Sequence, residues 1–351
     1  MKIKTQAPTV HIDGSQGEGG GQILRTALSL SAITGRPFSL TQIRAGRKKP
    51  GLMRQHLTCV ESVAEICGAK TSDPTVGSTE LEFEPGPIRA LDASFAIGTA
   101  GSTSLLAQAI LPVALCAPGA SEFVLSGGTH VMASPSTDFL ADLFLPALQE
   151  MGAEVELKLE RHGFFPAGGG QVRLKVQPFS RRIPFERHEK PASLEVGLEV
   201  LMTKGVPPEV AEKEIAQVEK AFGADQLSKF VLGIRNAASD GNAVILRASE
   251  PDGAVRALSC ALGSRGVRAE KVAQTAIRGL KRFLTGSVPI DEHLADQLLL
   301  PLALVGEGSF TTGELTPHFH TNCDVIRRFL EVEIKIDPRP NGENRVSVQT
   351  V

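Results

Sequence analysis

The sequence has no tryptophan and no tyrosine, so phenylalanine and histidine supply all of its aromatic rings. Any stacking on a nucleic-acid base therefore depends on Phe, His or Arg. Long hydrophobic runs are also absent, because no apolar stretch approaches the roughly 20 residues that span a bilayer. No basic segment followed by an apolar one precedes the first expected strand. We therefore expect a soluble, cytoplasmic protein with no membrane partner.

Cysteine is scarce, and the charges of the two signs are nearly balanced. The five cysteines form no CxxC pair, and their odd number favours reduced thiols over a disulfide framework or a zinc site. A net charge of −2 argues against a protein that coats nucleic acid through its overall charge. A local patch that grips one nucleic-acid end is compatible with this balance.

A chain of 351 residues predicts two domains rather than one. Three segments share a pattern in which a helix ends near a glycine, and a strand, a polar loop and a second helix follow. Gly35 and Gly68 are as far apart as Gly119 and Gly152, whereas the third copy, near Gly306, is shorter. Strands with apolar–polar alternation complete each unit. The expected fold class is α+β, built from three βαβα-plus-hairpin repeats with pseudo-threefold symmetry.

Residues 184–285 interrupt this pattern and are expected to form an inserted small α/β domain. A Lys/Arg-rich stretch marks the start of the segment. It is followed by a strand, a helix that begins at Pro208, three further strands and a basic helix over 269–284. The flanking parts, residues 1–183 and 286–351, are expected to form one large catalytic domain.

Five glycines and one carboxylate, Glu18, lie between Gly14 and Gly21. A strand is expected before them, and a helix that contains Arg25 is expected after them. Strand, glycine loop and helix N-terminus is a geometry that presents backbone N–H groups to an anion. The stretch matches neither the P-loop nor the dinucleotide fingerprint. On pattern alone, a tight turn with close backbone packing is the stronger interpretation.

The loop over 44–54 carries five cations, among them Arg44 and Arg47, together with two glycines and a proline. Most charge runs are solvated surfaces, and a basic turn is the alternative here. The glycines and the proline indicate a shaped loop, and Arg suits bidentate contact with phosphate. We therefore expect this loop to bind phosphate.

The corresponding loops of the other two units carry different chemistry. The second, over 126–138, is small and polar and offers Ser136 or Thr137 as a helix cap. The third contains His318 and His320; loop histidines are more often structural, but here they would point to the same cleft as the arginines. Histidine can act as a neutral nucleophile at physiological pH.

Four motifs, in the same order, resemble the RNA 3′-terminal phosphate cyclase family: Gly17-Glu18-Gly-Gly-Gly-Gln22-Ile-Leu-Arg25, Ile43-Arg44-Ala-Gly-Arg47-x-Lys49-Pro-Gly-Leu-x-Arg54-Gln55-His56, His162-Gly-Phe-x-Pro-Ala-Gly-Gly-Gly and Leu294-Ala-Asp-Gln-Leu298. The likeness runs from the first strand to the last helix. It implies a large domain of three repeats, each like the C-terminal domain of translation initiation factor three, with a smaller inserted α/β domain.

The resemblance implies an ATP-dependent, nucleotidyl-transferring ligase of the catalytic branch, which acts on RNA 3′-phosphate ends. A histidine attacks the α-phosphorus of ATP, becomes adenylylated and releases pyrophosphate. AMP then moves to the RNA 3′-phosphate to give RNA(3′)pp(5′)A, and the neighbouring 2′-OH closes a 2′,3′-cyclic phosphodiester and expels AMP. The covalent step divides one difficult displacement into easier ones, and ring closure is intramolecular.

The same resemblance assigns roles to individual residues. His318 falls on the nucleophile's position, and the nearby His320 stands where relatives carry an apolar residue. Glu18 corresponds to an acid that faces a divalent metal, Mg or Mn. The implied phosphate ligands are Arg25, Arg44 and Arg47, and the implied nucleotide contacts are Gln55, Gln108, Pro135, Phe139, His293, Asp296 and Gln297.

Two of these assignments have alternatives in the sequence itself. Asp296 and Gln297 could contact a ribose, but a carboxylate near a helix start also suits the helix dipole. His293 stands where relatives can carry a tyrosine, which leaves adenine stacking at that wall open.

Two other classes of protein compete with this interpretation. A non-catalytic relative that acts in ribosome assembly should lack the nucleophile and the arginines, whereas His318, Arg44 and Arg47 are present. An enolpyruvyl transferase uses similar repeats, but six of them and its own lysine-bearing motifs would be expected. No oligomeric state is predicted.

Overall fold

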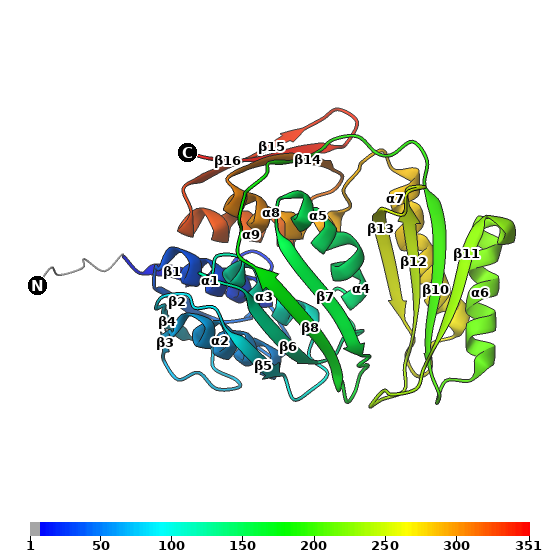
Figure 1. Cartoon of the computed structure of the whole chain (residues 1–351), viewed down its shortest axis with the longest axis horizontal. Coiled ribbons are helices and arrows are strands. Elements are labelled where there is room, and N and C mark those ends of the chain that lie inside the picture. Colours follow the sequence, from blue (N-terminus) through cyan, green and yellow to red (C-terminus); the bar gives the residue numbers. More distant parts are fainter. Residues whose placement is uncertain (1–7) are drawn as a thin grey trace, which may run out of the picture.

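The computed structural model describes residues 8–351 and shows a mixed α+β protein (Figure 1). Within that range the strands form four sheets of four strands each. No helix in this range is both long and apolar enough to cross a membrane. The predicted mixture of helices and small sheets is therefore confirmed.

Three of the sheets share one strand order, in which the first, second, fourth and third strands along the chain lie side by side, whereas the fourth sheet has the order second, first, third and fourth. In each of the three, the first pair of strands is parallel and the next two pairs are antiparallel. In spatial order, the strands are β1 (Val10–Asp13), β2 (Phe38–Thr41), β4 (Leu81–Glu84) and β3 (Lys70–Thr71) in the first sheet; β5 (Asp92–Ala96), β6 (Ser121–Gly127), β8 (Gly170–Gln177) and β7 (Glu154–Arg161) in the second; and β9 (Phe185–Arg187), β14 (Glu307–Thr312), β16 (Asn344–Thr350) and β15 (Val332–Pro338) in the third.

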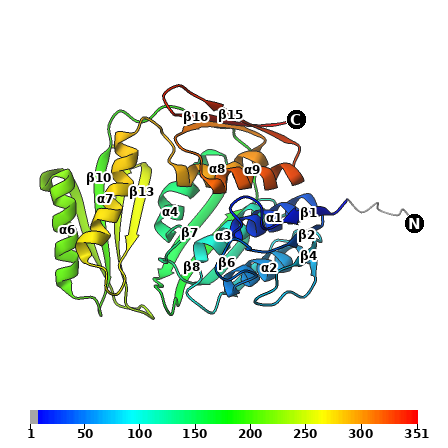
Figure 2. The same ribbon diagram turned by 180° about the vertical axis from the view of Figure 1, so that it is seen from behind.

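The helices that accompany these three sheets meet in one core. They are α1 (Gly21–Thr34) and α2 (Arg54–Cys67); α3 (Thr103–Ala114), α4 (Thr137–Phe139), the π-helix η1 (Leu140–Phe144) and α5 (Leu145–Glu150); and α8 (Glu292–Val305) and α9 (Pro317–Phe329). Helix α1 packs against α2, α3 and α9, as the rear view shows (Figure 2). Leu28, Ile110 and Leu299 come from different helices and are fully buried in this core. Each such side chain contributes roughly 1.5–3 kcal/mol, so the core fixes how the helix N-termini lie relative to one another.

Helices α1 and α2 end at glycines, as the sequence predicts. Gly35 has φ 69° and Gly68 has φ 59°, and each donates its backbone N–H to a carbonyl of the preceding turn. Because a Cβ atom disfavours this left-handed conformation, glycine is the residue that ends a helix in this way at little cost.

The fourth sheet lies beside the second (Figure 1). Its strands, in spatial order, are β11 (Leu227–Ile234), β10 (Glu195–Thr203), β12 (Asn242–Ser249) and β13 (Val255–Leu262). Helices α6 (Pro208–Phe222) and α7 (Ala269–Thr285) pack together, and the short 3₁₀ turn η2 (Ala224–Gln226) follows α6. Strand β13 contacts η1, so this sheet touches the helical segment of the second sheet directly.

The strand pairing moves one expected boundary. Strand β9 runs parallel to β14, with Phe185 opposite Gly308 and Arg187 opposite Phe310. Residues 185–187, which the sequence assigned to the inserted segment, therefore lie in the third sheet. Their short length hides the signal, because three residues show no clear alternation.

Helix α9 begins earlier than expected. The sequence analysis places His318 and His320 in the loop before this helix, but the hydroxyl of Thr316 accepts the N–H of Phe319, and Pro317 occupies the first helical position. Both features favour a helix start at this point. His318 therefore lies in the first turn of a helix rather than in a loop.

Candidate active site

The glycine stretch before α1 is docked on the first turn of α9. The backbone N–H of Glu18 donates to the hydroxyl of Thr321 at 3.0 Å, and that hydroxyl donates to the carbonyl of Pro317 at 2.7 Å. Gly17 has φ 59°, and a Cβ there would collide with Thr321. The glycine permits this close approach, which brings two segments some 300 residues apart in sequence into contact.

The second anchor of α9 is Asn322. Its side-chain oxygen accepts the hydroxyl of Thr26 at 2.8 Å, and its Nδ2 donates to the carbonyl of Asp296 at 3.0 Å. Asn322 is buried and ties α9 to both α1 and α8. These bonds fix the helix turn that carries His318.

His318 is oriented by the first turn of α1. Its Nδ1 lies 2.8 Å from Oε1 of Gln22 and 3.6 Å from a carboxylate oxygen of Glu18. An amide oxygen only accepts hydrogen bonds, so in this arrangement Nδ1 carries the proton and Nε2 keeps its lone pair. The side chain is 45% exposed, which leaves the ring accessible from solvent.

The electrostatic surroundings keep His318 neutral. Burial is the largest cause that lowers its pKa, and the charges of Arg25, Arg47 and His293 lower it further. A neutral imidazole with a free Nε2 is chemically competent as a nucleophile.

The carboxylate of Glu18 is nearly buried, with few partners among the described residues. Its side chain is 8% exposed, and neither oxygen accepts a hydrogen bond within residues 8–351. Its one close partner among these residues, apart from His318, is the guanidinium of Arg47, with which it forms an ion pair. No group of three or more His, Cys, Asp or Glu side chains in the described part of the chain could hold a metal by itself.

The donor set around Glu18 fits a magnesium ion that is held mainly by phosphate oxygens. Mg²⁺ is usually bound through one or two carboxylates together with substrate phosphates and water, rather than by an all-protein cage. One carboxylate with unsatisfied oxygens matches that pattern. It does not match a structural metal site.

Arg25 and Arg44, both expected phosphate ligands, differ in their hydrogen bonding. The Arg25 guanidinium forms no hydrogen bond or ion pair with any residue from 8 to 351, and burial lowers its pKa. Arg44 adopts φ 56°, and its Nη1 donates to the carbonyls of Lys49 and Gly51 at 2.9 and 2.7 Å. Arg25 is therefore available to an anion, whereas part of Arg44 shapes its own loop.

His56 is a member of the site that the sequence interpretation gave no role. Its ring is nearly buried, and its Nδ1 accepts the N–H of Met53 at 3.3 Å. Burial, followed by the charges of Arg25, Arg44 and Arg47, lowers its pKa to about 3. It is a neutral ring among three cations. Like Gln22, it lies inside a motif that carries the family resemblance, and that was the available signal.

The expected nucleotide contacts divide into two groups. Gln108 on α3 donates to Oε1 of Gln297 on α8, so these two meet across the helix interface. Asp296, which precedes Gln297 in the sequence, is buried. Its carboxylate accepts a hydrogen bond from the hydroxyl of Thr316 at 2.7 Å. Burial raises the pKa of Asp296 to about 7, against the effect of that hydrogen bond.

The other expected contacts are less closely connected. Gln55 accepts the N–H of Ser102 at 2.6 Å and thereby links α2 to the start of α3. Phe139 is buried in α4, and Pro135 is partly exposed in the loop before it. His293 is exposed on α8, yet it is near enough to lower the pKa of both His318 and Asp296.

Fold and site together define a mixed α+β protein in which a neutral histidine lies beside a carboxylate, near an arginine that has no partner within residues 8–351. A family model described as RNA 3′-terminal phosphate cyclase matches residues 16–336. The chain therefore belongs to the RNA 3′-terminal phosphate cyclase family. The family and the enzyme class predicted from the motifs are confirmed.

Similar proteins extend over almost the whole chain. The RNA 3′-terminal phosphate cyclase of Salmonella enteritidis is 43% identical over 336 residues, which cover 96% of this chain and 98% of that protein. The enzyme of Ralstonia nicotianae is 44% identical, and the match covers 94% of this chain and 94% of that protein. The enzyme of Pseudomonas fluorescens is also 44% identical, and the match covers 97% of this chain and 97% of that protein. Among solved structures, the enolpyruvyl transferase NikO from Streptomyces tendae has 10% identity over 99% of this chain and 66% of that chain. Its TM-score of 0.29 is too low to indicate a common fold.

Proposed function

We propose that the chain uses ATP to convert an RNA 3′-terminal phosphate to a 2′,3′-cyclic phosphodiester, with a covalent His318–AMP intermediate. The observation that carries this proposal is the state of His318. It is a neutral imidazole whose Nδ1 is held by Gln22 and whose Nε2 is free, and arginines lie close enough to lower its pKa. Family membership supports the overall reaction, and this geometry supports the histidyl step.

In the first step, Nε2 of His318 forms a bond to the α-phosphorus of ATP, and the bond to pyrophosphate breaks. The imidazole gains positive charge as its lone pair is used. The Glu18 carboxylate, 3.6 Å from Nδ1, stabilises that charge, and Gln22 holds the Nδ1 proton. Arg25 and Arg47 neutralise charge on the phosphate oxygens that leave.

In the second and third steps, AMP passes from His318 to the RNA 3′-phosphate, and the 2′-OH then displaces AMP from the activated phosphorus. The first transfer returns the lone pair to Nε2 of His318. Ring closure needs little from the protein beyond positioning, because the 2′-OH and the phosphate belong to the same ribose. Arg44 and Arg47, on the loop over 44–54, are the cations proposed to hold the RNA phosphate.

We also propose that Glu18 holds a divalent ion, Mg or Mn, together with the nucleotide phosphates. Bound there, the ion would supply positive charge to the phosphoryl group under attack. The ion pair with Arg47 would have to open to admit it, so Arg47 would then be released toward phosphate.

The repeat architecture belongs to the same proposal. The shared strand topology of three sheets supports three copies of a βαβα-plus-hairpin unit, pseudo-threefold and like the C-terminal domain of initiation factor three. The third copy would take its first strand, β9, from before the inserted domain. The large catalytic domain would then comprise residues 1–187 together with 286–351.

Labelling with ATP that carries the label on its α-phosphate tests the nucleophile. His318→Ala should abolish covalent labelling of the protein. The matched control is His320→Ala, because His320 lies on the same helix turn with its side chain exposed, and labelling should persist. Labelling that survives loss of His318 would show that another residue is the nucleophile.

A further inference from the structure

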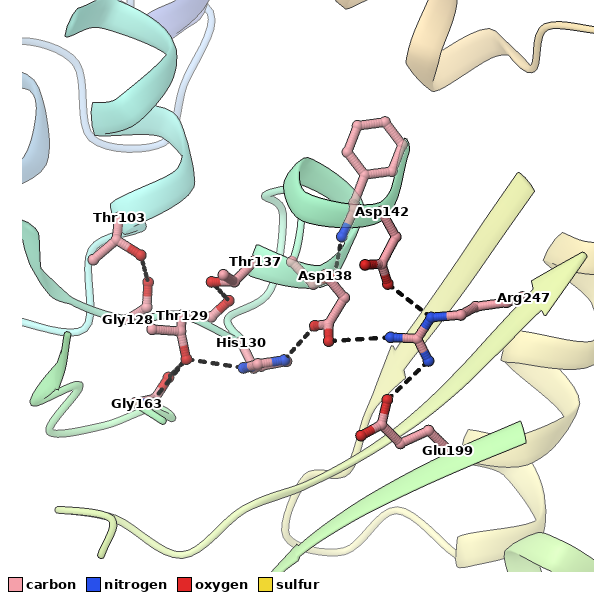
Figure 3. Close-up of polar contacts among 12 residues, drawn as sticks. Thr103, Gly128, Thr129, His130, Thr137, Asp138, Asp142, Gly163, Glu199 and Arg247 are labelled. Carbon is pink, nitrogen blue, oxygen red and sulfur yellow. Dashed lines mark hydrogen bonds and ion pairs between the residues drawn. The ribbon is translucent and has the colours of Figure 1, made fainter. Parts of the chain in front are cut away.

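A polar network outside the chemical centre joins the second sheet's helical segment to the fourth sheet (Figure 3). His130 is buried in the loop after β6, and its Nε2 lies 2.6 Å from Oδ2 of Asp138. The other carboxylate oxygen of Asp138 lies 3.4 Å from Nη2 of Arg247, which belongs to β12. The network therefore runs from one part of the molecule to the other through Asp138.

On one side, the network closes the loop over 130–138. The His130–Asp138 bond joins the two ends of the loop. Thr137 adds two bonds to the carbonyl of Thr129, from its N–H at 3.1 Å and its hydroxyl at 3.3 Å. The hydroxyl of Thr129 in turn contacts His130 at 2.8 Å. Residues at the base of this loop have little freedom to move independently.

On the other side, Arg247 contacts three carboxylates. Its Nε lies 2.7 Å from Asp142 on η1, and its Nη1 lies 2.8 Å from Glu199 on β10. The guanidinium fork thus engages two acids of the helical segment, Asp138 and Asp142, and one of its own sheet. A planar fork with donors in fixed directions transmits orientation as well as charge.

The ionisation states make these bonds strong ones. Burial raises the pKa of Asp138, but the hydrogen bond to His130 and the charges of His130 and Arg247 outweigh it and bring the pKa to about 2. With that low pKa, Asp138 is charged, as is Arg247. Their side chains are 14% and 21% exposed, so the ion pair is largely removed from water.

Asp138 lies between two residues that the family resemblance assigns to the nucleotide site. Pro135 precedes it by one short turn and Phe139 follows it directly, and both are among the nucleotide contacts that the family resemblance implies; we take them as the wall of the pocket for the base. We infer that Arg247 is a positioning residue through which the inserted domain holds the base pocket of the nucleotide site. This inference rests on the proposed function, since it takes ATP as the nucleotide that Pro135 and Phe139 contact.

A simple interface role would have a different signature. A residue that only joins two domains affects stability, and its loss lowers nucleotide affinity no more than the loss of any comparable bridge. A residue that positions the base pocket affects recognition of the base and leaves contacts with the phosphates unchanged.

The chain offers a matched control in Arg256. It lies on β13 of the same sheet, bonds to Glu250, and reaches Glu150 of α5 at 3.7 Å, but it has no contact with the loop over 130–138. Arg247→Met and Arg256→Met therefore each remove one bridge between the same two parts of the molecule.

The test measures binding and reaction separately. Equilibrium binding of ATP, GTP and inorganic pyrophosphate is measured in a His318→Ala background, and α-phosphate labelling is measured with His318 present. Arg247→Met should weaken ATP binding about tenfold, since a misplaced contact of this kind typically costs one to two orders of magnitude. It should also reduce the preference for ATP over GTP and leave pyrophosphate binding unchanged, while Arg256→Met changes none of these.

Each alternative outcome has a distinct consequence. Unchanged ATP binding in Arg247→Met, or equal losses in both variants, would overturn the positioning role. Absence of labelling in the parent protein would overturn the proposed chemistry. The comparison of ATP binding in Arg247→Met and Arg256→Met would still test the positioning role of Arg247. If Arg247→Met does not fold, Glu199→Gln loosens Arg247 from within its own sheet and should show a smaller loss in the same direction; no loss there would overturn the role.

Discussion

Nδ1 of His318 lies 2.8 Å from Oε1 of Gln22, and this contact joins the first turn of α9 to the first turn of α1. Because the amide oxygen accepts a hydrogen bond from the Nδ1–H group, the contact selects the tautomer in which Nε2 is the nucleophilic nitrogen. The glycine stretch is what allows the two helix starts to approach, since Gly17 leaves room for Thr321. One hydrogen bond thus links the glycine loop to the proposed covalent chemistry.

Gln22→Ala should slow adenylylation by about 10–100-fold and change ATP affinity little, because it removes the group that orients His318 and no proposed contact with the nucleotide. Single-turnover labelling gives the rate, and nucleotide titration gives the affinity. Gln22→Glu keeps an oxygen acceptor and should retain more of the rate than Gln22→Ala. Equal losses in the two variants would argue against tautomer selection by this residue.

The rate of adenylylation should depend on pH through His318. Burial, then Arg25, Arg47 and His293, lower its pKa, so the ring remains neutral below the ordinary histidine value of 6.5. The neutral form is the nucleophile, so the acidic limb of the pH–rate profile should lie below the position that an ordinary histidine would give it.

Arg47→Gln removes one of the charges that lower this pKa. The acidic limb of the pH–rate profile should therefore move upward in that variant, whatever happens to the plateau. An acidic limb that stays in place would show that another group controls it.

The sequence predicts the elements around the candidate site, but it does not predict how the site residues are arranged in space. The strands and helices emerged from local patterns, because apolar period and glycine termini are local properties, whereas the roles of the motif residues were implied by the resemblance to a family. The Gln22–His318 contact could not emerge in that way, since the two residues are far apart in the sequence. The pairing of β9 with β14 is likewise a long-range choice, made after the inserted segment returns to the third sheet.

Arg25 should show opposed effects on stability and activity. Its guanidinium has no partner among residues 8–351, and burial lowers its pKa, so the folded protein bears a desolvation cost that a phosphate would offset. Arg25→Met should raise the free energy of unfolding by about 1 kcal/mol, because an apolar side chain of similar length bears no such cost. The same change should reduce adenylylation by about 100-fold or more, since a cation aimed at the transferring phosphate is lost.

Chemical denaturation without nucleotide measures the first effect, and single-turnover labelling measures the second. A variant that is both less stable and fully active would contradict the assignment of Arg25 to phosphate. The Arg278→Met variant serves as control, because Arg278 is exposed on α7, outside the site, and should change neither quantity much.

Asp296 should make stability fall as the pH rises. Burial raises its folded pKa to about 7 from an ordinary value of 3.8, so the folded protein prefers the protonated form. The contribution of the Asp296 carboxyl to the free energy of unfolding is fully present below pH 3.8. As the pH rises toward 7, on the order of 4 kcal/mol of this contribution is lost. Asp296→Asn does not titrate, and its Oδ1 can still accept the hydroxyl of Thr316. In thermal unfolding followed without nucleotide from pH 5 to pH 8, the variant should therefore match the parent protein most closely at pH 5, exceed it increasingly up to about pH 7 and keep a nearly constant advantage above that. Curves for the two proteins that stay parallel across this range would show that the Asp296 carboxyl is not the buried, proton-binding group that its surroundings indicate.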